Sequence, residues 1–387
     1  MQFIDLGAQQ RRIRQKIEKN ILAVLDHGRY IMGPEIGELE QRLADYAGVR
    51  HVLGCSSGTD ALLMALMAHD VGPGDAVFTT PFTFIATAEV IRLLGATPVF
   101  AEIDPATFNL DPASLEKTIV ALKTNAPETS PLPGGVRVSD LTPRGIIAVD
   151  LFGLPADYSA IGEIARKHGL FVIEDAAQSF GAESGGRRAG AMADIACTSF
   201  FPAKPLGCYG DGGALFTDND ALVEKMASIR VHGKGIHKYD NARIGINGRL
   251  DAIQAAILLA KLDIFPDEIE RRQGIARRYS ERLSAIAGLT PPSVPDGYTS
   301  AWAQYSVLAA DEEHRAALQA RLKSADVPTA IYYPKPLHMQ TAFADLGYRA
   351  GDFPVSEDFA RRIFSLPMHP YLEEADQIRI TDILAGA

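Results

Sequence analysis

One stretch near the middle of the chain holds two residue types that could cooperate in amino-group chemistry. From residue 171 to residue 213 it reads FVIEDAAQSFGAESGGRRAGAMADIACTSFFPAKPLGCYGDGG. Its apolar, β-branched start predicts a buried strand that ends at Asp175, and ligands of open α/β sheets collect where such strands end. A second strand-like run, 195–201, leads to Lys204, which stands between two prolines and just before a Gly-rich turn.

These two residues could together serve a pyridine cofactor. A carboxylate fixed at a strand end can hold a proton on a pyridine nitrogen, and a desolvated lysine in a stiff turn can lose its proton and attack a carbonyl. Pyridoxal 5'-phosphate (PLP) needs both groups, a Schiff-base lysine and an acid partner for the ring nitrogen. A lone lysine or aspartate is far more often a solvated surface residue. The order strand, Asp175, strand, Ser199, Lys204, Gly-rich turn is what favours PLP.

The same stretch carries a family resemblance. EDAAQSFGA followed by SFFPAKPLGCYGDGG resembles the DegT/DnrJ/EryC1/StrS group of sugar aminotransferases, and the likeness extends from FIDLGAQQ at the start to SLPMHPYL near the end. The resemblance implies a PLP-dependent transferase of fold type I, with a mostly parallel, seven-stranded sheet wrapped by helices and a small C-terminal α+β domain. It also implies Lys204 and Asp175 as the catalytic residues.

An anion site is predicted where the strand HVLGC meets a helix. Gly58 and Thr59 open that helix, where free N–H groups and the helix dipole attract anions and where glycine lets a ligand come close. A plain helix N-cap is the alternative, because Ser and Thr are favoured caps. The resemblance implies that both residues bind the cofactor phosphate with Ser199, and that Asn247 reaches the phosphate in the neighbouring subunit of a homodimer.

Further residues are assigned to the cofactor ring and the substrate. By resemblance Phe84 stacks on the ring, although an aromatic residue at a strand end is equally typical of a core. Gln178, one helical turn after Asp175, is expected to reach the ring's 3-oxygen. Packing or solvent exposure is the alternative for each expected substrate contact. Close relatives often carry His where this chain has Tyr332. The expected substrate contacts are Tyr30, Arg249, Tyr332 and Tyr333.

Strand and helix patterns alternate along most of the chain, which predicts a parallel sheet with helices on both sides. The Pro-, Thr-, Ser- and Gly-rich segment 123–145 breaks this alternation and predicts a surface insertion. The predicted parts are an N-terminal arm and helix (1–28), a large PLP-binding α/β domain (29–250), a linking helix (251–285) and a small C-terminal α+β domain (286–387).

Composition narrows the classes of function. The chain has 387 residues and a net charge of −10, and no long Lys/Arg cluster indicates a nucleic-acid surface. Its three cysteines have neither paired nor metal-ligand spacing, which is typical of reduced thiols, and no metal is expected. The N-terminus is polar after five residues and no apolar run is long enough to cross a bilayer, so a cytoplasmic location without a membrane partner is predicted.

The resemblance implies an aminotransferase that moves an amino group from L-glutamate to a UDP-linked keto-sugar. The chain is most similar to enzymes that aminate UDP-2-acetamido-2-deoxy-3-keto-glucuronic acid for surface polysaccharide (O-antigen) synthesis. Another UDP- or dTDP-linked 3-keto or 4-keto hexose is the nearest alternative. Two other classes stay open: a PLP enzyme acting on amino acids, such as a cysteine desulfurase or threonine aldolase, and a non-enzymatic, ligand-binding regulator. Some members carry His in place of Lys204 and dehydrate their substrate, so Lys204 favours amino transfer.

Overall fold

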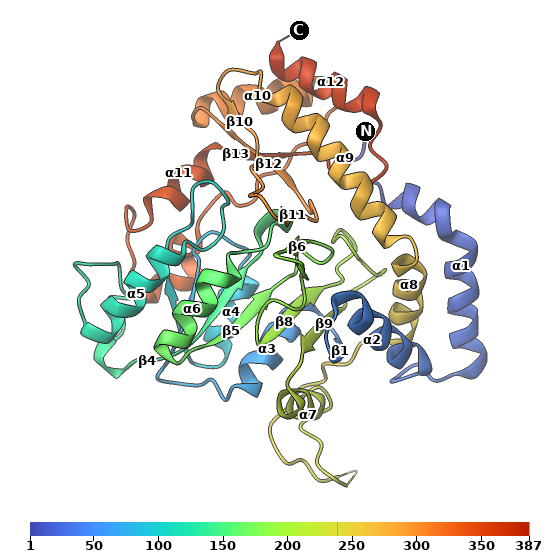
Figure 1. Ribbon diagram of the computed structural model, residues 1–387, viewed down its shortest axis with the longest axis vertical. Coiled ribbons are helices and arrows are strands. Elements are labelled where there is room, and N and C mark those ends of the chain that lie inside the picture. Colours follow the sequence, from blue (N-terminus) through green and yellow to red (C-terminus); the bar gives the residue numbers. More distant parts are fainter. Residues whose placement is uncertain (238, 387) are drawn as a thin grey trace.

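The computed structural model describes residues 1–237 and 239–386 and is organised around one seven-stranded sheet (Figure 1). Across the sheet the strands are β1 (His51–Cys55), β9 (Gly213–Thr217), β8 (Ile195–Ser199), β5 (Phe171–Asp175), β4 (Thr142–Val149), β2 (Asp75–Thr79) and β3 (Thr97–Phe100). Within this sheet β9 is antiparallel to its two neighbours, β1 and β8. The remaining neighbouring strands are parallel to one another. The predicted α/β class with a mostly parallel, seven-stranded sheet is confirmed.

The shared direction of the strands brings the candidate residues to one edge. Since β1, β2, β4, β5 and β8 all point the same way, their carboxyl ends meet at what we call the carboxyl edge. Asp175 ends β5, Ser199 ends β8, and Gly58 opens helix α3 (Gly58–Ala68) shortly after β1. The opposite side, where these strands begin, is the amino edge.

Helices cover both faces of the sheet, as buried parallel strands require. Helices α3, α4 (Ala86–Leu93) and α7 (Asp220–Ile229) pack on one face. Helices α5 (Pro112–Thr124), α6 (Tyr158–His168), α2 (Pro34–Ala47) and α8 (Ala252–Leu262) pack on the other. Successive residues such as Ile146 and Ile147 belong to opposite faces and are both fully buried, which explains the continuous apolar runs.

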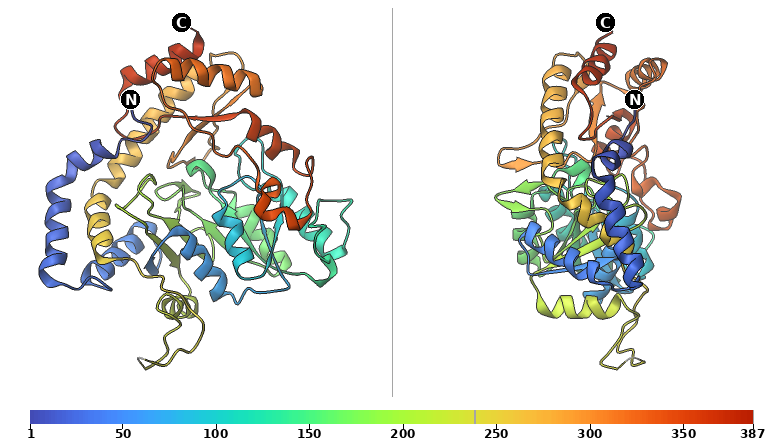
Figure 2. Two further views of the ribbon diagram at one scale, coloured as in Figure 1. Left: turned by 180° about the vertical axis from the view of Figure 1, so that it is seen from behind. Right: turned by 90° about the vertical axis from the view of Figure 1, so that its right-hand side faces the viewer.

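The predicted linking helix is wrong in one respect, because the chain forms two helices there. Helix α8 ends at Leu262 and α9 (Phe265–Leu283) starts anew. Pro266 lies in the first turn of α9 and lacks the backbone N–H that an unbroken helix would need there, so it separates the two. Helix α1 (Leu6–His27) ends at Gly28 in the left-handed region (φ 68°), as predicted, and lies alongside α8 (Figure 2).

The C-terminal part has its own core around a small antiparallel sheet. Strand β12 (Tyr305–Ala309) lies between β10 (Leu289–Thr290) and β13 (Ile363–Leu366). Helices α9, α10 (Glu312–Ser324) and α12 (Glu374–Ala385) cover it, and α11 (Pro354–Arg362) leads into β13. A third sheet joins β11 (Tyr298–Thr299) to β6 (Glu183–Ser184) and β7 (Arg187–Arg188), so it connects the C-terminal part to the segment after β5. The domain boundaries themselves stay predictions.

The segment predicted as a surface insertion is shorter than 123–145. Helix α5 continues to Thr124, where Asn125 caps it in the left-handed region (φ 51°), and β4 already begins at Thr142. Between them lies a loop with one short 3-10 helix (Val138–Asp140). The loop is not purely a surface feature, because Leu132 is buried in the core beside α5. That it is an insertion stays a prediction.

One buried lysine gives a prediction about stability. Only 1% of Lys261 is exposed, its amine makes no hydrogen bond within the described residues, and it lies 4.3 Å from the centre of the Tyr209 ring. Burial lowers the pKa of Lys261 to about 8. We expect Lys261→Met to stabilise the fold by about 1–2 kcal/mol near pH 7, because removing an unpaired buried charge outweighs a lost cation–π contact.

The pH dependence of that effect has a defined sign. The unfolded chain keeps the proton of this lysine up to about pH 10.4, whereas the folded chain releases it near pH 8. Because the unfolded state binds more protons between these values, Lys261 makes wild-type stability rise with pH there. Urea midpoints at about pH 7 and about pH 9.5 should differ less in Lys261→Met than in wild type. Equal pH slopes in the two proteins would contradict this, and exposed Lys117→Met is the matched control.

Candidate active site

Lys204 lies in a tight turn that follows β8 at the carboxyl edge. Strand β8 ends at Ser199 rather than at residue 201, because the chain then folds back: the Cys208 N–H donates to the Phe200 carbonyl at 2.7 Å, and the Lys204 N–H donates to the Phe201 carbonyl at 2.9 Å. A side chain at Gly207 would collide with this turn, since its Cβ would lie 2.5 Å from the carbonyl oxygen of Pro202. The sequence of the turn therefore fixes the backbone position of Lys204.

The structure brings Lys204 and Asp175 within electrostatic reach of each other. The half-buried Lys204 makes no side-chain hydrogen bond among the described residues, and burial lowers the pKa of its amine while the Asp175 carboxylate acts in the opposite direction. Asp175 is 5% exposed; burial raises its pKa, and the Thr87 hydroxyl, the Ala177 N–H and Lys204 lower it. An amine with a lowered pKa is more readily neutral, and a neutral amine is a nucleophile.

Gln178 lies beside the same carboxylate but not on a helix. Residues 176–180 form a turn after β5, closed by the Ser179 N–H donating to the Ala176 carbonyl at 3.2 Å, so the predicted helical turn is wrong. The Gln178 side chain is fixed at both ends. Its Oε1 accepts from the Phe152 N–H at 2.8 Å, and its Nε2 donates to the Tyr333 hydroxyl at 3.3 Å.

Two of the predicted aromatic residues, Phe84 and Tyr333, lie near each other at this site. Phe84 is 53% exposed, and its ring centre lies 6.3 Å from that of Tyr333, whereas the neighbouring Phe82 is fully buried in the core. An exposed ring at the carboxyl edge is available to stack on a flat ligand. Tyr332 instead packs between Phe3 and Tyr333, with ring centres 6.4 and 5.9 Å away. Of the two tyrosines, Tyr333 therefore joins the group around Asp175.

Gly58, Thr59 and Ser199 form the cradle expected for an anion. A Cβ atom on Gly58 would lie 2.7 Å from the Cβ of Ser199, and one on Gly213 would lie 2.5 Å from the carbonyl carbon of Ser57, so both glycines are needed for the close approach. Ser57 is the helix N-cap and accepts from the Asp60 N–H. Within the described residues the N–H groups of Gly58 and Thr59 donate to nothing. Two free N–H groups, a helix N-terminus and a hydroxyl suit a phosphate.

Three further predicted residues lie on a neighbouring pair of segments. The Ala252 N–H donates to the Tyr30 carbonyl at 3.0 Å, and Arg249 pairs with Cys55 at the end of β1. Arg249 Nε is buried without a hydrogen-bond partner in the described part of the chain. Tyr30 and Asn247 are exposed, and no recorded contact joins either side chain to Lys204 or Asp175 within the described single chain.

Comparison with known proteins decides which family this geometry represents. The family described as the DegT/DnrJ/EryC1/StrS aminotransferase family matches residues 11–385. The chain belongs to the DegT/DnrJ/EryC1/StrS aminotransferase family. It is 48% identical over 375 residues to a UDP-2-acetamido-2-deoxy-3-oxo-D-glucuronate aminotransferase of Pseudomonas aeruginosa, covering 97% of each chain. It is also 42% identical over 386 residues to the pleiotropic regulatory protein of Geobacillus stearothermophilus, covering 99% of this chain and 97% of that one.

Solved structures agree with this family membership. A DegT/DnrJ/EryC1/StrS aminotransferase from Brucella abortus has a TM-score of 0.93 and 50% identity, covering 100% of this chain and 99% of the other. The Bacillus subtilis protein NtdA, solved with bound cofactor PMP, has a TM-score of 0.85 and 28% identity, covering 99% of this chain and 82% of the other. PMP is the amino form of PLP. The predicted fold type I and the predicted cofactor, PLP, are thereby confirmed for this DegT/DnrJ/EryC1/StrS chain.

The residues at the carboxyl edge fit this family's cofactor. An anion cradle, an exposed aromatic ring, a buried carboxylate and an unpaired amine are the four groups that a phosphorylated pyridine aldehyde needs. Gly58 gives a direct test of the cradle, because a Cβ there must displace Ser199. We expect Gly58→Ala to weaken PLP binding about 10- to 100-fold, since the phosphate loses its close approach to the backbone.

That expectation is measured as the PLP dissociation constant of the apo-protein, by fluorescence or absorbance titration. Gly162→Ala is the matched control, because nothing lies within 4 Å of a Cβ added at Gly162, which is on α6. An unchanged PLP affinity in Gly58→Ala would show that the phosphate is held elsewhere.

Two residues of this site have no counterpart in the sequence prediction. Thr87 donates to the Asp175 carboxylate at 2.8 Å. Asp150, the residue directly after β4, is fully buried and accepts a hydrogen bond from the Ser179 hydroxyl at 2.6 Å. It therefore holds the turn that carries Gln178. The rule that identified Asp175, an acid directly after a buried strand, also applies to Asp150 in GIIAVD. Thr87 gives a weaker signal, since only its spacing from Thr83 at i, i+4 marks it.

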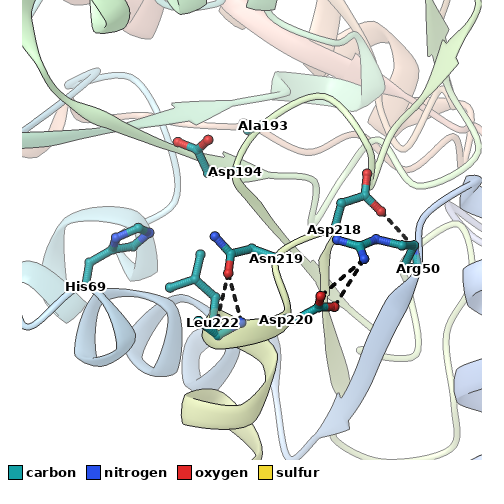
Figure 3. Close-up of a pocket in the computed structure, with 9 residues that line it drawn as sticks. Arg50, His69, Ala193, Asp194, Asp218, Asn219, Asp220 and Leu222 are labelled. Atoms are coloured by element: carbon teal, nitrogen blue, oxygen red, sulfur yellow. Dashed lines mark hydrogen bonds and ion pairs between the residues drawn. The ribbon is translucent and has the colours of Figure 1, made fainter.

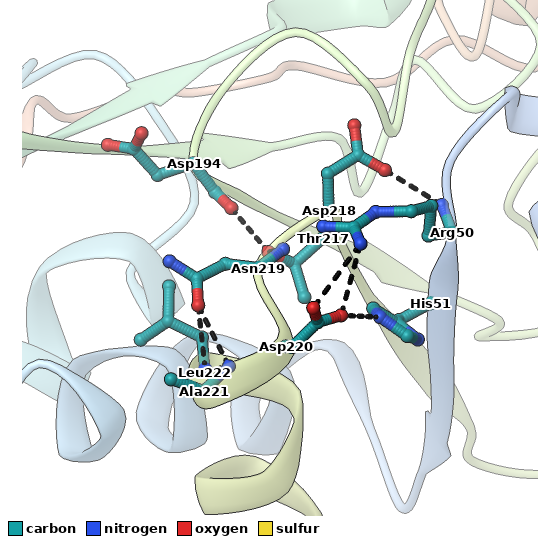
Figure 4. A network of polar contacts seen from close by, with 9 residues as sticks. All are labelled: Arg50, His51, Asp194, Thr217, Asp218, Asn219, Asp220, Ala221 and Leu222. Carbon is teal, nitrogen blue, oxygen red and sulfur yellow. Dashed lines mark hydrogen bonds and ion pairs between the residues drawn. The ribbon is translucent and has the colours of Figure 1, made fainter.

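A hollow lies at the amino edge of the sheet in this aminotransferase (Figure 3). It measures about 670 Å³ and is lined by Arg50, His69, Asp194, Asp218, Asn219 and Asp220, among others. Its polar groups mostly satisfy one another (Figure 4). Asp220 accepts from His51 and Arg50, Asp218 accepts from the Arg50 N–H, and Asn219 caps α7. We therefore interpret these contacts as local structure that holds β1 against the start of α7.

The cysteines argue against a thiol-based reaction. All three are buried and free, and burial raises the pKa of Cys208 to about 11, so its thiolate is disfavoured. Cys208 lies four residues after Lys204, in the hydrogen-bonded turn. Within residues 1–237 and 239–386 no group of His, Cys, Asp and Glu side chains could hold a metal ion, and no helix is long and apolar enough to cross a membrane.

Proposed function

We propose that this family member is a PLP-dependent aminotransferase that transfers an amino group from L-glutamate to a nucleotide-linked keto-sugar. The proposed acceptor is UDP-2-acetamido-2-deoxy-3-keto-glucuronic acid, which gives UDP-2-acetamido-3-amino-2,3-dideoxy-glucuronic acid. The observation that carries the proposal is that the Lys204 amine lies within electrostatic reach of the Asp175 carboxylate, at the same edge of the sheet as the close approach of Gly58 to Ser199. The acceptor follows from the 48% identity to the Pseudomonas aeruginosa enzyme.

Each candidate residue at the carboxyl edge would have its own task in this reaction. Bound PLP supplies an electron sink that stabilises negative charge on the carbon losing its proton. Lys204 would bond to the cofactor aldehyde at rest and, once displaced by the amino donor, would carry the proton between the donor carbon and the cofactor carbon as general base and acid. Asp175 would hold a proton on the ring nitrogen. Gln178 would contact the 3-oxygen, and Tyr333 would contact substrate from the C-terminal part.

A homodimer with shared active sites belongs to the same proposal. The chain between α7 and α8 projects well beyond the body of the molecule (Figures 1 and 2). It carries apolar side chains in solvent, with Ile236 91% and Ile244 85% exposed, and Asn247 lies near its end. Exposed apolar groups concentrated on a projecting segment are typical of a surface that another protein covers. A second copy of the chain would cover it and receive Asn247 at its cofactor phosphate, while Arg249 and Tyr30 would contact the sugar nucleotide.

The substrate is tested by a single turnover of the pyridoxamine-loaded enzyme with a panel of UDP- and dTDP-linked 3-keto and 4-keto sugars, read by mass. We expect the UDP-linked 3-keto uronate to gain the amino group fastest. If a 4-keto hexose or a dTDP-linked sugar reacts faster, the proposed acceptor is wrong while the aminotransferase class stands. L-Glutamate as donor is tested in the same system by its conversion to 2-oxoglutarate.

One observation favours a second candidate function, a ligand-binding regulator without catalysis. The regulatory protein of Geobacillus stearothermophilus shares 42% identity with this chain. The two functions differ in a simple measurement: an aminotransferase with bound PLP is yellow and is bleached by L-glutamate, whereas a regulator that only binds a ligand is not bleached. The predicted cytoplasmic location and the predicted role in O-antigen synthesis stay predictions.

A further inference from the structure

Asp175 is hydrogen-bonded by a buried threonine that the proposed reaction does not use directly. Thr87 lies in the first turn of α4 and is fully buried, and its Oγ1 is 2.8 Å from Asp175 Oδ2. Its hydroxyl also lies 3.2 Å from the hydroxyl of Thr83, one turn earlier and 3% exposed. Three buried polar side chains therefore form one chain of contacts that ends on the carboxylate.

The direction of the hydrogen bonds among Thr83, Thr87 and Asp175 depends on the charge of Asp175. Each threonine hydroxyl carries one proton, and an ionised carboxylate carries none. When Asp175 is ionised, the Thr87 hydroxyl must donate its hydrogen bond to Asp175, and the Thr83 hydroxyl must donate to the Thr87 oxygen. When Asp175 is protonated, either Asp175 donates to Thr87 or Thr87 donates to an oxygen that holds less charge. The arrangement Thr83 to Thr87 to Asp175 therefore stabilises the carboxylate form, since hydrogen bonds to charged groups are the stronger ones.

Burial disfavours the negative charge of Asp175, which is 5% exposed. Ionisable groups that interact with Asp175 come from the end of β4, from β8, from α6, from the turn after β8 and from the C-terminal part. They are Asp150, Cys197, Tyr158, Lys204 and Tyr333. Among these only Lys204 is a cation, and bonding to an aldehyde would change its charge. Thr87 and the Ala177 N–H at 3.2 Å then remain as the uncharged donors to the carboxylate.

We propose that Thr87 is a positioning residue of the aminotransferase: its hydroxyl holds Asp175 in the ionised state that keeps the cofactor's ring nitrogen protonated. This rests on the proposed function, because it requires PLP at the carboxyl edge. Thr87 also connects the Asp175 carboxylate to the segment that carries Phe84. The Thr87 N–H donates to the Phe84 carbonyl at 3.3 Å, so one turn carries both the exposed ring and the hydroxyl that fixes Asp175.

The test reads the ring nitrogen itself. Apo-protein is reconstituted with PLP carrying ¹⁵N in the ring, and the ¹⁵N chemical shift is followed from about pH 6 to about pH 9 in wild type, Thr87→Val and Thr87→Ser. Valine keeps the shape of threonine but has no hydroxyl, and serine keeps the hydroxyl. Thr118→Val is the matched control, because Thr118 is fully buried on α5 and its hydroxyl contacts the Ser114 carbonyl and Ser130.

We expect wild type, Thr87→Ser and Thr118→Val to keep the protonated signal throughout. In Thr87→Val the Asp175 carboxylate is left a stronger base, so the proton should lie on Asp175 rather than on the ring nitrogen about 10- to 100-fold more often. The signal should therefore move toward the unprotonated value across the whole pH range, and kcat/KM for L-glutamate should fall by a similar factor. If Thr87→Val does not fold, Thr87→Ala carries the same test. A protonated signal at every pH in the hydroxyl-free variant would overturn the inference. Wild type that binds no PLP would instead overturn the proposed function.

Discussion

Replacing Lys204 with alanine is expected to lower kcat for amino transfer by at least about 1,000-fold, because one side chain supplies both the bond to the cofactor and the proton transfer. Within the described part of the chain no other amine is placed to take over, since Lys204 is the only cation there among the groups that shift the pKa of Asp175. The measurement is steady-state production of 2-oxoglutarate from L-glutamate with the keto-sugar acceptor.

Two controls make that result specific to Lys204. Lys117→Ala removes an exposed lysine on α5 and should keep kcat within about twofold of wild type. Added methylamine should restore part of the activity of Lys204→Ala, because a small free base can enter the space of the missing side chain. Turnover of Lys204→Ala at the wild-type rate would contradict the assignment of Lys204.

Replacing Asp175 with asparagine is expected to slow the half-reaction with L-glutamate by about 100- to 10,000-fold. The amide matches the carboxylate in shape but carries no charge, so it cannot stabilise a proton on the ring nitrogen, and negative charge at the reacting carbon is less well dispersed. In Asp175→Asn the affinity for PLP should fall by a much smaller factor than the rate of the half-reaction. The reason is that the phosphate cradle around Gly58 and Ser199 is unchanged. Stopped-flow absorbance with excess L-glutamate measures the rate, and equilibrium titration measures the affinity.

Asp218→Asn is the matched control for this substitution. Asp218 lies in the hollow at the amino edge and accepts from the Arg50 N–H, far along the sheet from the carboxyl ends. We expect the rate of this variant to stay within about twofold of wild type. If Asp175→Asn reacted as fast as Asp218→Asn, the ring nitrogen would have another partner and the assignment of Asp175 would be wrong.

The elements of the sheet could be predicted from the sequence because burial on both faces leaves a simple pattern. Strands such as β5 and β8 are short apolar runs, and the predicted end of β5 placed Asp175 at the edge where ligands collect. The tight turn around Lys204 was predictable from its prolines and glycines. The prediction failed where helical periodicity continues across a break, as between α8 and α9, because Pro266 interrupts the backbone without changing the apolar spacing.

Contacts between distant segments explain what could not be predicted. Tyr333 reaches Gln178 across 155 residues, and Thr87 reaches Asp175 across 88, so their roles depend on how the elements pack rather than on a local pattern. Resemblance supplied Tyr333 but not Thr87. For Tyr30 and Asn247 no side-chain contact joins either residue to Lys204 or Asp175 within the described residues of the single chain, and the proposed role of Asn247 depends on a neighbouring subunit.

The most direct test is to reduce the PLP-loaded protein with borohydride, digest it and map the phosphopyridoxyl label by mass spectrometry. Reduction converts a reversible bond between the cofactor aldehyde and an amine into a permanent one, so the label marks the residue that holds PLP. We predict one label per chain, on the peptide that contains Lys204, and none after incubation with L-glutamate before reduction. A label on any other lysine, or none at all, would contradict the pairing of Lys204 with Asp175 across one cofactor ring.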